Sequence, residues 1–298
     1  MVPLFLFTYS NPMKHLIFLS IILVACNSSE TEQTTPSMAS DLTAFSSGYS
    51  EVNGLTMYYE VHGSGDPIVL IHGGGSTIET NWSQLIPLLT ANRKVIAMEL
   101  QAHGRTTDRG MDSSFEEDAD DVATLLGNLD IEKADILGFS NGATTALQLA
   151  IRHPNQVNKL IAISPLTKRN GVPDFFWDFM KNDSLENMPK PLQEGFLKVN
   201  PDTTKLQIMH GRDAKRMVNF EDIPDKLLQS IKAPTLLVVG DKDIILPAHL
   251  LELQQLISNC EMAIIPGTHG ECIGEITTLN PIYKQDYVVG LFEEFLEK

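Results

Sequence analysis

The chain has 298 residues, of which 43% are apolar and 20% charged, and its 38 Asp and Glu against 22 Lys and Arg give a formal charge of −16. A globular chain of this length can bury roughly three quarters of its unfolded surface, and this composition excludes a wholly disordered or collagen-like protein. The acidic balance disfavours nucleic-acid binding, and three cysteines without a CxxC pair provide neither a zinc ribbon nor a disulfide framework.

The N-terminal segment predicts export. A short apolar run over residues 16–26 follows Lys14 and is too short to span a bilayer comfortably, which is typical of a secretory signal. Its last four residues (LVAC) end at Cys26 and also resemble a bacterial lipoprotein signal, in which cleavage precedes an acylated cysteine. We therefore predict a signal segment over residues 1–25 and a membrane-anchored bacterial lipoprotein with its lipid on Cys26, periplasmic or at the cell surface. The alternative is an ordinary cleaved signal with an incidental cysteine.

Residues 26–47 are expected to form a polar tether. The stretch 27–40 (NSSETEQTTPSMAS) is rich in Ser, Thr and acids and has almost nothing to bury. We expect the folded part to begin near Gly48.

Strand-like and helical segments then alternate. Glu51–Val61 surrounds Asn53-Gly54 and predicts a β-hairpin. Nearly continuous apolar runs predict strands buried on both faces: Pro67–His72, Lys94–Glu99, Ala134–Phe139, Lys159–Ile163, Thr235–Val239 and Glu261–Ile265. Helical patterns separate several of them: Ser114–Leu129, Ala143–Ile151, His249–Ile257 and Tyr283–Leu296. The alternation predicts an α/β fold with a mostly parallel central sheet and helices on both faces.

One long interval interrupts this alternation. The more than sixty residues between Pro165 and Ile231 contain no buried-strand run, and a structureless loop of that length would be unusual. We predict a helical insertion over 166–227 within a core of 48–165 and 228–298. The three aromatic residues Phe175, Phe176 and Trp177 have two expected roles that do not exclude each other: they pack this insertion onto the core, and rings among them line an apolar substrate pocket.

A candidate nucleophile lies where a buried strand meets a helix. Gly138-Phe139-Ser140-Asn141-Gly142 has the pattern GxSxG directly after an apolar run. A serine on such a sharp turn requires very small neighbours two residues away on either side, because larger side chains would collide. The sequence therefore predicts that Ser140 is an exposed nucleophile.

A glycine-rich turn predicts an oxyanion hole. The four residues 72–75 (HGGG) follow another buried strand. Acyl transfer passes through a tetrahedral oxyanion, which preorganised backbone N–H groups stabilise. We expect these donors to be the amides of Gly74 and Asn141, unless the glycines form only a flexible turn.

The nucleophile needs a base, and the base needs an acid that orients it. His269 follows the last predicted strand, and Asp243 follows the strand before it. Asp241 is close enough to compete with Asp243, but a carboxylate in that turn is expected to bind local N–H groups. The expected trio is therefore Ser140, Asp243 and His269.

These motifs resemble the α/β-hydrolase superfamily, in particular its small esterase, enol-lactonase and non-haem haloperoxidase-like group, from about residue 48 to the C-terminus. The order of the trio along the chain is that of this superfamily. Residues 99–106 (ELQAHGRT) are similar to its D-x-R-G-x-G-x-S loop, although Gln101 and Ala102 stand where Arg and Gly are usual. The insertion is similar to the family's cap domain. His103 in the loop has either a structural role or a contact with substrate.

The resemblance implies a serine hydrolase that cleaves a small or medium carboxylic ester through an acyl-enzyme on Ser140, with no metal or organic cofactor. Epoxide hydrolases and haloalkane dehalogenases of this fold use Asp where this chain has Ser140. The expected partner is a small-molecule ester or lactone.

Three alternatives remain open at this point. A lactonase or a C–C-bond hydrolase could use the same trio, because the motifs specify the nucleophile and not the leaving group. A catalytically silent binding lipoprotein could retain the fold. An aminopeptidase-like enzyme could use acids of the insertion, such as Asp174, Asp178 and Glu194, to bind a substrate amine.

Overall fold

The computed structural model describes residues 45–278 and 284–298. The predicted signal segment, Cys26 and most of the predicted tether lie outside these residues. Within them, no helix combines the length and the apolar character that a membrane crossing requires.

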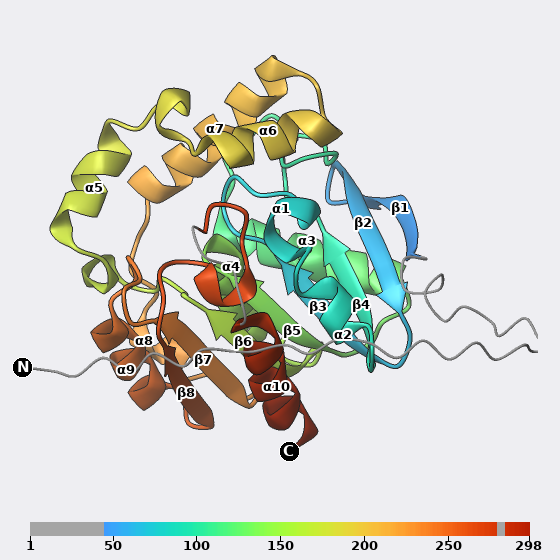
Figure 1. The fold of residues 1–298 in the computed structure, drawn as a ribbon, viewed down its shortest axis with the longest axis vertical. Helices are drawn as coiled ribbons and strands as arrows, with labels where there is room; N and C mark the ends of the chain where they lie inside the picture. The colour runs from blue at the N-terminus through green and yellow to red at the C-terminus, as the bar shows by residue number, and fades with distance from the viewer. Residues whose placement is uncertain (1–44, 279–283) are drawn as a thin grey trace, which may run out of the picture. The chain divides into compact units, whose positions relative to one another are not determined.

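The core of the described chain is an eight-stranded sheet (Figure 1). Its spatial order is β1-β2-β4-β3-β5-β6-β7-β8, and only β2 runs antiparallel to its neighbours β1 and β4. The strands are β1 (Phe45–Val52), β2 (Leu55–Gly63), β3 (Asp66–Ile71), β4 (Arg93–Met98), β5 (Ala134–Phe139), β6 (Val157–Ile163), β7 (Thr235–Gly240) and β8 (Cys260–Ile265). Each of the six predicted apolar runs forms a strand, and the predicted hairpin is β1–β2, with positive φ at Asn53 and Gly54.

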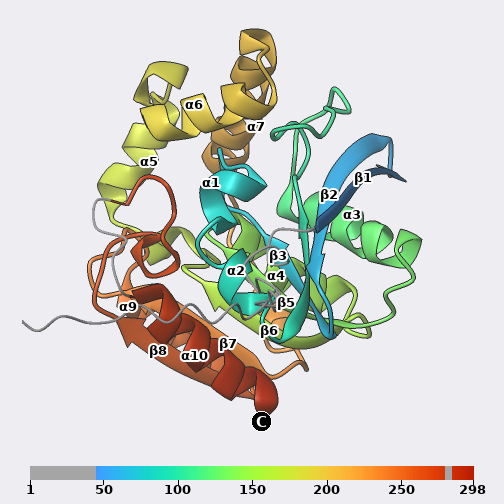
Figure 2. The ribbon, with the colours of Figure 1, turned by 45° about the vertical axis from the view of Figure 1, so that its right-hand side comes forward.

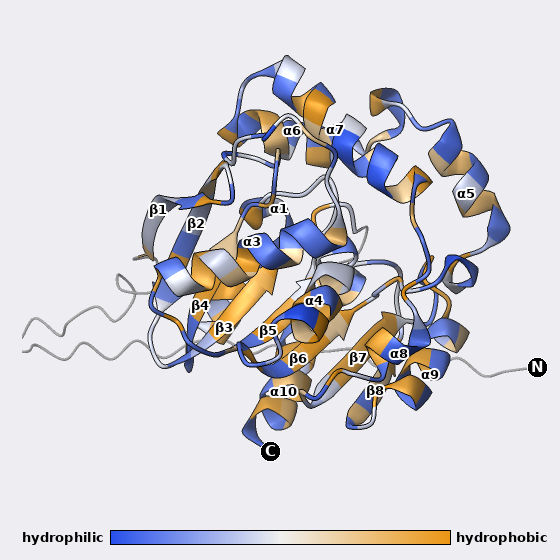
Figure 3. Cartoon of the chain, turned by 180° about the vertical axis from the view of Figure 1, so that it is seen from behind, coloured by the Kyte–Doolittle hydropathy of each residue, from blue (hydrophilic) through white to orange (hydrophobic). Residues whose placement is uncertain are grey.

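Helices cover both faces of the sheet. On one face lie α3 (Phe115–Asn128), α4 (Asn141–Arg152), α8 (Asp225–Leu228) and α9 (Pro247–Leu256), whose apolar residues share one buried cluster with the strands (Figure 3). On the other face lie α1 (Ile78–Trp82), α2 (Ile86–Leu89) and α10 (Lys284–Glu297), which build a second cluster. This arrangement confirms the fold class predicted from the sequence.

The interval without strands connects β6 to β7 and is helical. It contains α5 (Asp174–Lys181), α6 (Lys190–Val199) and α7 (Thr203–Val218), which lie together beyond one end of the sheet (Figure 2). A small apolar cluster joins α6 and α7 to Ala102 of the loop after β4. We refer to α5–α7 and their connections as the cap. It lies at the edge where the parallel strands end, and this is the edge where ligands bind in open α/β sheets.

Candidate active site

Ser140 lies on a sharp turn between β5 and α4. Its backbone has φ 54° and ψ −121°, a conformation that non-glycine residues rarely adopt and that commonly marks a functional site. A Cβ on Gly138 would overlap the carbonyl oxygen of Gly142, and a Cβ on Gly142 would overlap that of Ile71. The two glycines of the GxSxG pattern are therefore required for the helix to start this close to the sheet.

Two further strand ends bring an imidazole and a carboxylate to this serine. His269 follows β8, and its Nε2 lies 3.0 Å from the Oγ of Ser140. Asp243 follows β7, and its Oδ1 lies 2.8 Å from the Nδ1 of His269. With a neutral imidazole, Nδ1–H donates to the carboxylate and Nε2 accepts the serine proton. This is the geometry required for a base that activates a nucleophile.

Asp243 is fixed by two other donors. Its Oδ1 accepts the N–H of Ile245 at 2.9 Å, and its Oδ2 accepts the hydroxyl of Ser164 at 2.6 Å. Ser164 is not among the residues predicted from the sequence, although it follows β6 directly and its positive φ of 54° marks another tight turn. Asp241 points elsewhere and accepts the N–H of Gly267 at 2.7 Å. Asp243 is thus the carboxylate that contacts the imidazole.

Asp243 and His269 stabilise each other's charged forms. Burial alone would lower the pKa of His269, but the charge and hydrogen bond of Asp243 outweigh burial and raise this pKa above its ordinary 6.5. Burial likewise would raise the pKa of Asp243, yet His269 and the Ser164 hydroxyl hold it below its ordinary value. Asp243 therefore remains ionised and supports an imidazolium when His269 gains a proton.

The glycine turn after β3 leaves one amide available. The N–H of Gly73 donates to Oδ1 of Asn81 at 2.7 Å, and that of Gly75 donates to Oδ2 of Asp213 at 2.7 Å. Among the described residues the N–H groups of Gly74 and Asn141 have no hydrogen-bond acceptor, and both residues line the same cavity as Ser140. These are the two amides that the sequence predicts to bind an oxyanion.

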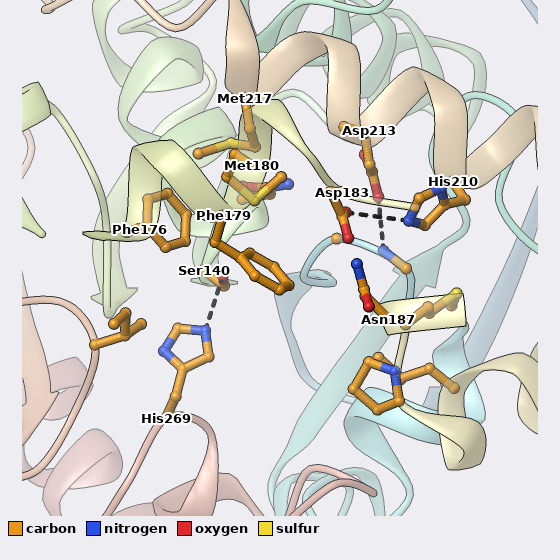
Figure 4. A pocket seen from close by; sticks show the side chains of 18 of the residues that line it. Ser140, Phe176, Phe179, Met180, Asp183, Asn187, His210, Asp213, Met217 and His269 are labelled. Carbon is orange, nitrogen blue, oxygen red and sulfur yellow. Dashed lines mark hydrogen bonds and ion pairs between the residues drawn. The ribbon is translucent and has the colours of Figure 1, made fainter. Parts of the chain in front are cut away.

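A cavity of about 510 Å³ lies between the cap and the strand ends and contains Ser140 and His269 on its wall. This volume is in the range of small-molecule sites. In Figure 4 the apolar side chains of Phe176, Phe179 and Met180 lie on one side of the view, and Asp183 and Asp213 lie on the other. The cavity is thus mainly apolar with a polar end formed by the cap.

The three aromatic residues predicted to bind substrate are placed differently from one another. Phe176 lines the cavity, whereas Phe175 and Trp177 do not: Phe175 is 65% exposed, and Trp177 is buried between the Arg169 guanidinium and the ring of Phe220. Of the three residues predicted to bind substrate, the structure therefore places Phe176 at the cavity and not Phe175 or Trp177, because successive residues of a helix point about 100° apart. Residues spaced by three or four, as in Phe176, Phe179 and Met180, would have been the better signal.

Sequence reasoning also missed the polar end of the cavity. Asp183 and Asp213 line it, and Asp183 pairs with His210 at 3.1 Å. His103 does not line the cavity; its Nε2 lies 3.0 Å from Asp213. No motif marks these residues, because their contacts depend on how the cap folds back over the sheet.

Comparison with known sequences places these features in one family. A sequence profile of the alpha/beta hydrolase fold matches residues 66–219, about half of the chain. The chain is 39% identical over 103 residues to the 2-hydroxymuconate semialdehyde hydrolase of Pseudomonas sp. strain CF600, a match that covers 33% of this chain and 36% of that relative. It is 27% identical over 248 residues to a non-heme chloroperoxidase of Kitasatospora aureofaciens, covering 73% and 90% respectively.

A solved structure supports the same fold. The enol-lactonase from Burkholderia xenovorans LB400 superposes with a TM-score of 0.66 and 19% sequence identity, over 84% of this chain and 100% of that one. At this identity the likeness concerns the fold alone.

Proposed function

Because the chain belongs to the alpha/beta hydrolase family, we propose that it is a serine hydrolase that cleaves a small or medium carboxylic ester through an acyl-enzyme on Ser140. The observation that carries this proposal is the continuous contact from Ser140 Oγ to His269 Nε2 at 3.0 Å and from His269 Nδ1 to Asp243 Oδ1 at 2.8 Å. A binding protein with a silent site would not need this arrangement.

The proposed acylation step uses these contacts. His269 takes the hydroxyl proton as Ser140 Oγ attacks the ester carbonyl, and the carbonyl electrons move onto oxygen. The amides of Gly74 and Asn141 donate to this oxyanion. When the intermediate collapses, the C–O bond of the leaving alcohol breaks, and His269 returns its proton to the alkoxide. Asp243 stays ionised throughout and stabilises the imidazolium.

Deacylation repeats these steps with water. His269 removes a proton from water as it attacks the acyl-enzyme carbonyl, and the same two amides bind the second oxyanion. The proton then passes to Ser140 Oγ, which restores the free enzyme and releases the acid.

The cavity wall favours an uncharged substrate. Among the described residues that line it there is no Lys or Arg, while Asp183 and Asp213 place two carboxylates there. A substrate with its own carboxylate, as the name of the muconate semialdehyde hydrolase specifies for that relative, would have no free cation to bind. This supports an ester, or a lactone as an internal ester, over the C–C-bond hydrolase and its acidic substrates.

The test is hydrolysis of p-nitrophenyl butyrate by the purified protein and by Ser140→Ala. We expect turnover by the wild type, labelling of Ser140 by a fluorophosphonate probe, and loss of both in the variant. Removal of a triad member typically costs a factor on the order of 10⁴ or more in kcat. Turnover by Ser140→Ala at a comparable rate, or a wild type that neither reacts with the probe nor cleaves any ester or lactone, would overturn the proposal.

We also propose that the enzyme is exported and anchored by lipid on Cys26, as the signal-like sequence before it suggests. Partition of the full chain into the detergent phase of a Triton X-114 extract supports the anchor if Cys26→Ser moves it to the aqueous phase. Equal partition of the two proteins contradicts it.

A further inference from the structure

One carboxylate of the cap, with its side chain 14% exposed, hydrogen-bonds to the glycine turn that carries the predicted oxyanion hole. Asp213 projects from α7 toward the glycine turn (Figure 4), where its Oδ2 accepts the N–H of Gly75 at 2.7 Å. The same oxygen accepts Nε2–H of His103 at 3.0 Å, and this Nε2 also lies 3.2 Å from the Gly75 nitrogen, so the carboxylate is the nearer acceptor for the Gly75 N–H. Oδ1 of Asp213 accepts a guanidinium N–H of Arg216. Asp213 thus links α7 to the turn after β3 by a hydrogen bond, while Met188 and Leu192 of the cap lie against Gly75 of the same turn.

The charges in this cluster have defined partners. Arg216 also binds Asp118 of α3, so two cations face two carboxylates when His103 is protonated. The side chains of Arg216, His103 and Asp118 are 4%, 3% and 2% exposed. Burial opposes ionisation of Asp213, but the charges of His103 and Arg216 outweigh it and hold its pKa far below the ordinary value. Asp213 therefore acts as an ionised acceptor held by Arg216 and His103.

The glycine turn needs support from outside because it has no side chains of its own. Asn81 holds the N–H of Gly73, Asp213 holds that of Gly75, and the amide of Gly74 between them remains available. Gly75 has φ +70°, and the Oδ2 of Asp213 lies 3.1 Å from the point that a Cβ on Gly74 would occupy. The carboxylate is packed directly against Gly74, a residue that lines the cavity and whose amide has no acceptor among the described residues.

We propose that Asp213 is a positioning residue for the oxyanion hole: through the Gly75 N–H it fixes the direction of the Gly74 amide, so the cap completes the catalytic geometry as well as covering the substrate. The inference rests on the proposed serine hydrolase function. Because the oxyanion exists only in the transition state and the intermediate, a misdirected Gly74 amide lowers kcat and leaves KM nearly unchanged.

Two variants separate position from charge. Asp213→Asn removes the charge and presents an N–H to donors that need an acceptor, while Asp213→Glu keeps the charge that buried Arg216 requires but moves the carboxylate by one methylene. We expect both to lower kcat for p-nitrophenyl butyrate by roughly 10- to 100-fold, because a displacement of about 1 Å in a catalytic group can cost that much. KM should remain within about threefold.

The matched control is Arg212→Gln. Arg212 precedes Asp213 on α7 and bridges the cap to Asp108 at 2.8 Å, but it does not line the cavity or touch the glycine turn. We expect its kcat to stay within about twofold of wild type, although its melting temperature falls. An equal loss of kcat in Arg212→Gln would mean that any loosening of the cap has this effect, and would overturn the specific role of Asp213.

A second readout distinguishes positioning from a general structural role. A trifluoromethyl ketone forms a tetrahedral oxyanion on the serine, whereas the corresponding amide binds without one. We expect Asp213→Glu to raise the inhibition constant of the ketone by the same factor as it lowers kcat/KM, and to raise that of the amide by less than about threefold. Equally weaker binding of both inhibitors, or a wild-type kcat in Asp213→Glu, would overturn the inference about Asp213. If Ser140→Ala is inactive in the same assays, the proposed serine hydrolase function still stands. The proposed function itself fails only if the wild type is inactive or if Ser140→Ala is active.

Discussion

His269 must be neutral to accept the proton of Ser140, so its pKa determines where on the pH scale the proposed reaction proceeds. Asp243 raises this pKa above 6.5 despite the opposing effect of burial. Below that pKa the imidazole is protonated and cannot act as a base. We therefore expect kcat/KM to fall on the acidic side with an apparent pKa above 6.5.

Asp243→Asn should change both the rate and the acidic limb of the pH profile of kcat/KM, which is the range in which kcat/KM falls as His269 becomes protonated. The amide can present its N–H to Nδ1 and favour the wrong tautomer, so we expect kcat at pH 8 to drop by about 10³- to 10⁴-fold. Loss of the carboxylate charge also lowers the pKa of His269, which moves the limb to lower pH. The measurement is kcat/KM for p-nitrophenyl butyrate from pH 5 to 9.

Asp241→Asn is the control for that experiment. It alters a carboxylate in the same turn but retains an oxygen for the Gly267 N–H, so its rate should stay within about threefold of wild type and its limb should not move. An Asp243→Asn limb at the wild-type position would contradict the electrostatic role assigned to Asp243.

At the residue scale, the sequence predicts which side chains meet at the strand ends, but it does not predict which side chains of the cap join them. Ser140, Asp243 and His269 each follow a buried strand, and the carboxyl ends of parallel strands meet at one edge, so their convergence could be expected. Asp213 and His103 are 110 positions apart on a helix and a loop. Their contact depends on the packing angle of α7 over the sheet, which no local pattern encodes.

At the element scale, the β5–Ser140–α4 turn depends on close backbone contact with β3. A methyl group on Gly142 would overlap the carbonyl oxygens of Ile71 and His72, neither of which can move without shifting the strand. We expect Gly142→Ala to lower the free energy of unfolding by about 1–3 kcal/mol, as overpacking in a core does. Displacement of Ser140 should also abolish esterase activity.

Gly127→Ala is the matched control for this substitution. Gly127 lies near the end of α3, and nothing lies within 4 Å of the position of its Cβ. We expect it to raise the free energy of unfolding by about 0.5–1 kcal/mol, because alanine is the better helix former. Chemical denaturation measures both variants. A Gly142→Ala protein as stable and active as wild type would show that the close contact is not required.

Element length explains which helices the sequence predicts. The 14-residue α3 and the 12-residue α4 show a full apolar periodicity, and Ser114 caps α3 by accepting the N–H of Glu117. In contrast, α1 and α2 have five and four residues, too few for a 3.6-residue period to be recognised. The capping box of Thr77 and Thr80 in α1 involves two threonines and not the usual acidic partner, so it gives little signal.

At the scale of the whole molecule, charge should select the substrate. The chain carries a formal charge of −16, and the described lining of the cavity adds Asp183 and Asp213 without a Lys or Arg. An anionic ester is repelled on approach by this net charge and, when bound, finds no Lys or Arg on the described lining to offset its desolvation, whereas a neutral ester has neither cost. We expect kcat/KM for a p-nitrophenyl hemiglutarate to be at least about tenfold below that for p-nitrophenyl butyrate at pH 8, since about 1.4 kcal/mol of repulsion suffices.

Ionic strength separates the two sources of this repulsion. Raising salt from about 0.02 to 0.5 M shortens the Debye length from above 10 Å to below 5 Å, which screens the field of the whole surface but not a carboxylate inside the cavity. The rate for the anionic ester should therefore rise only part of the way toward that of the neutral ester, and the neutral ester should change little. Asp183→Asn should recover part of the remainder, because it removes one wall charge. If the hemiglutarate is cleaved as fast as the butyrate at low salt, the cavity does not discriminate by charge, and acidic substrates return as candidates.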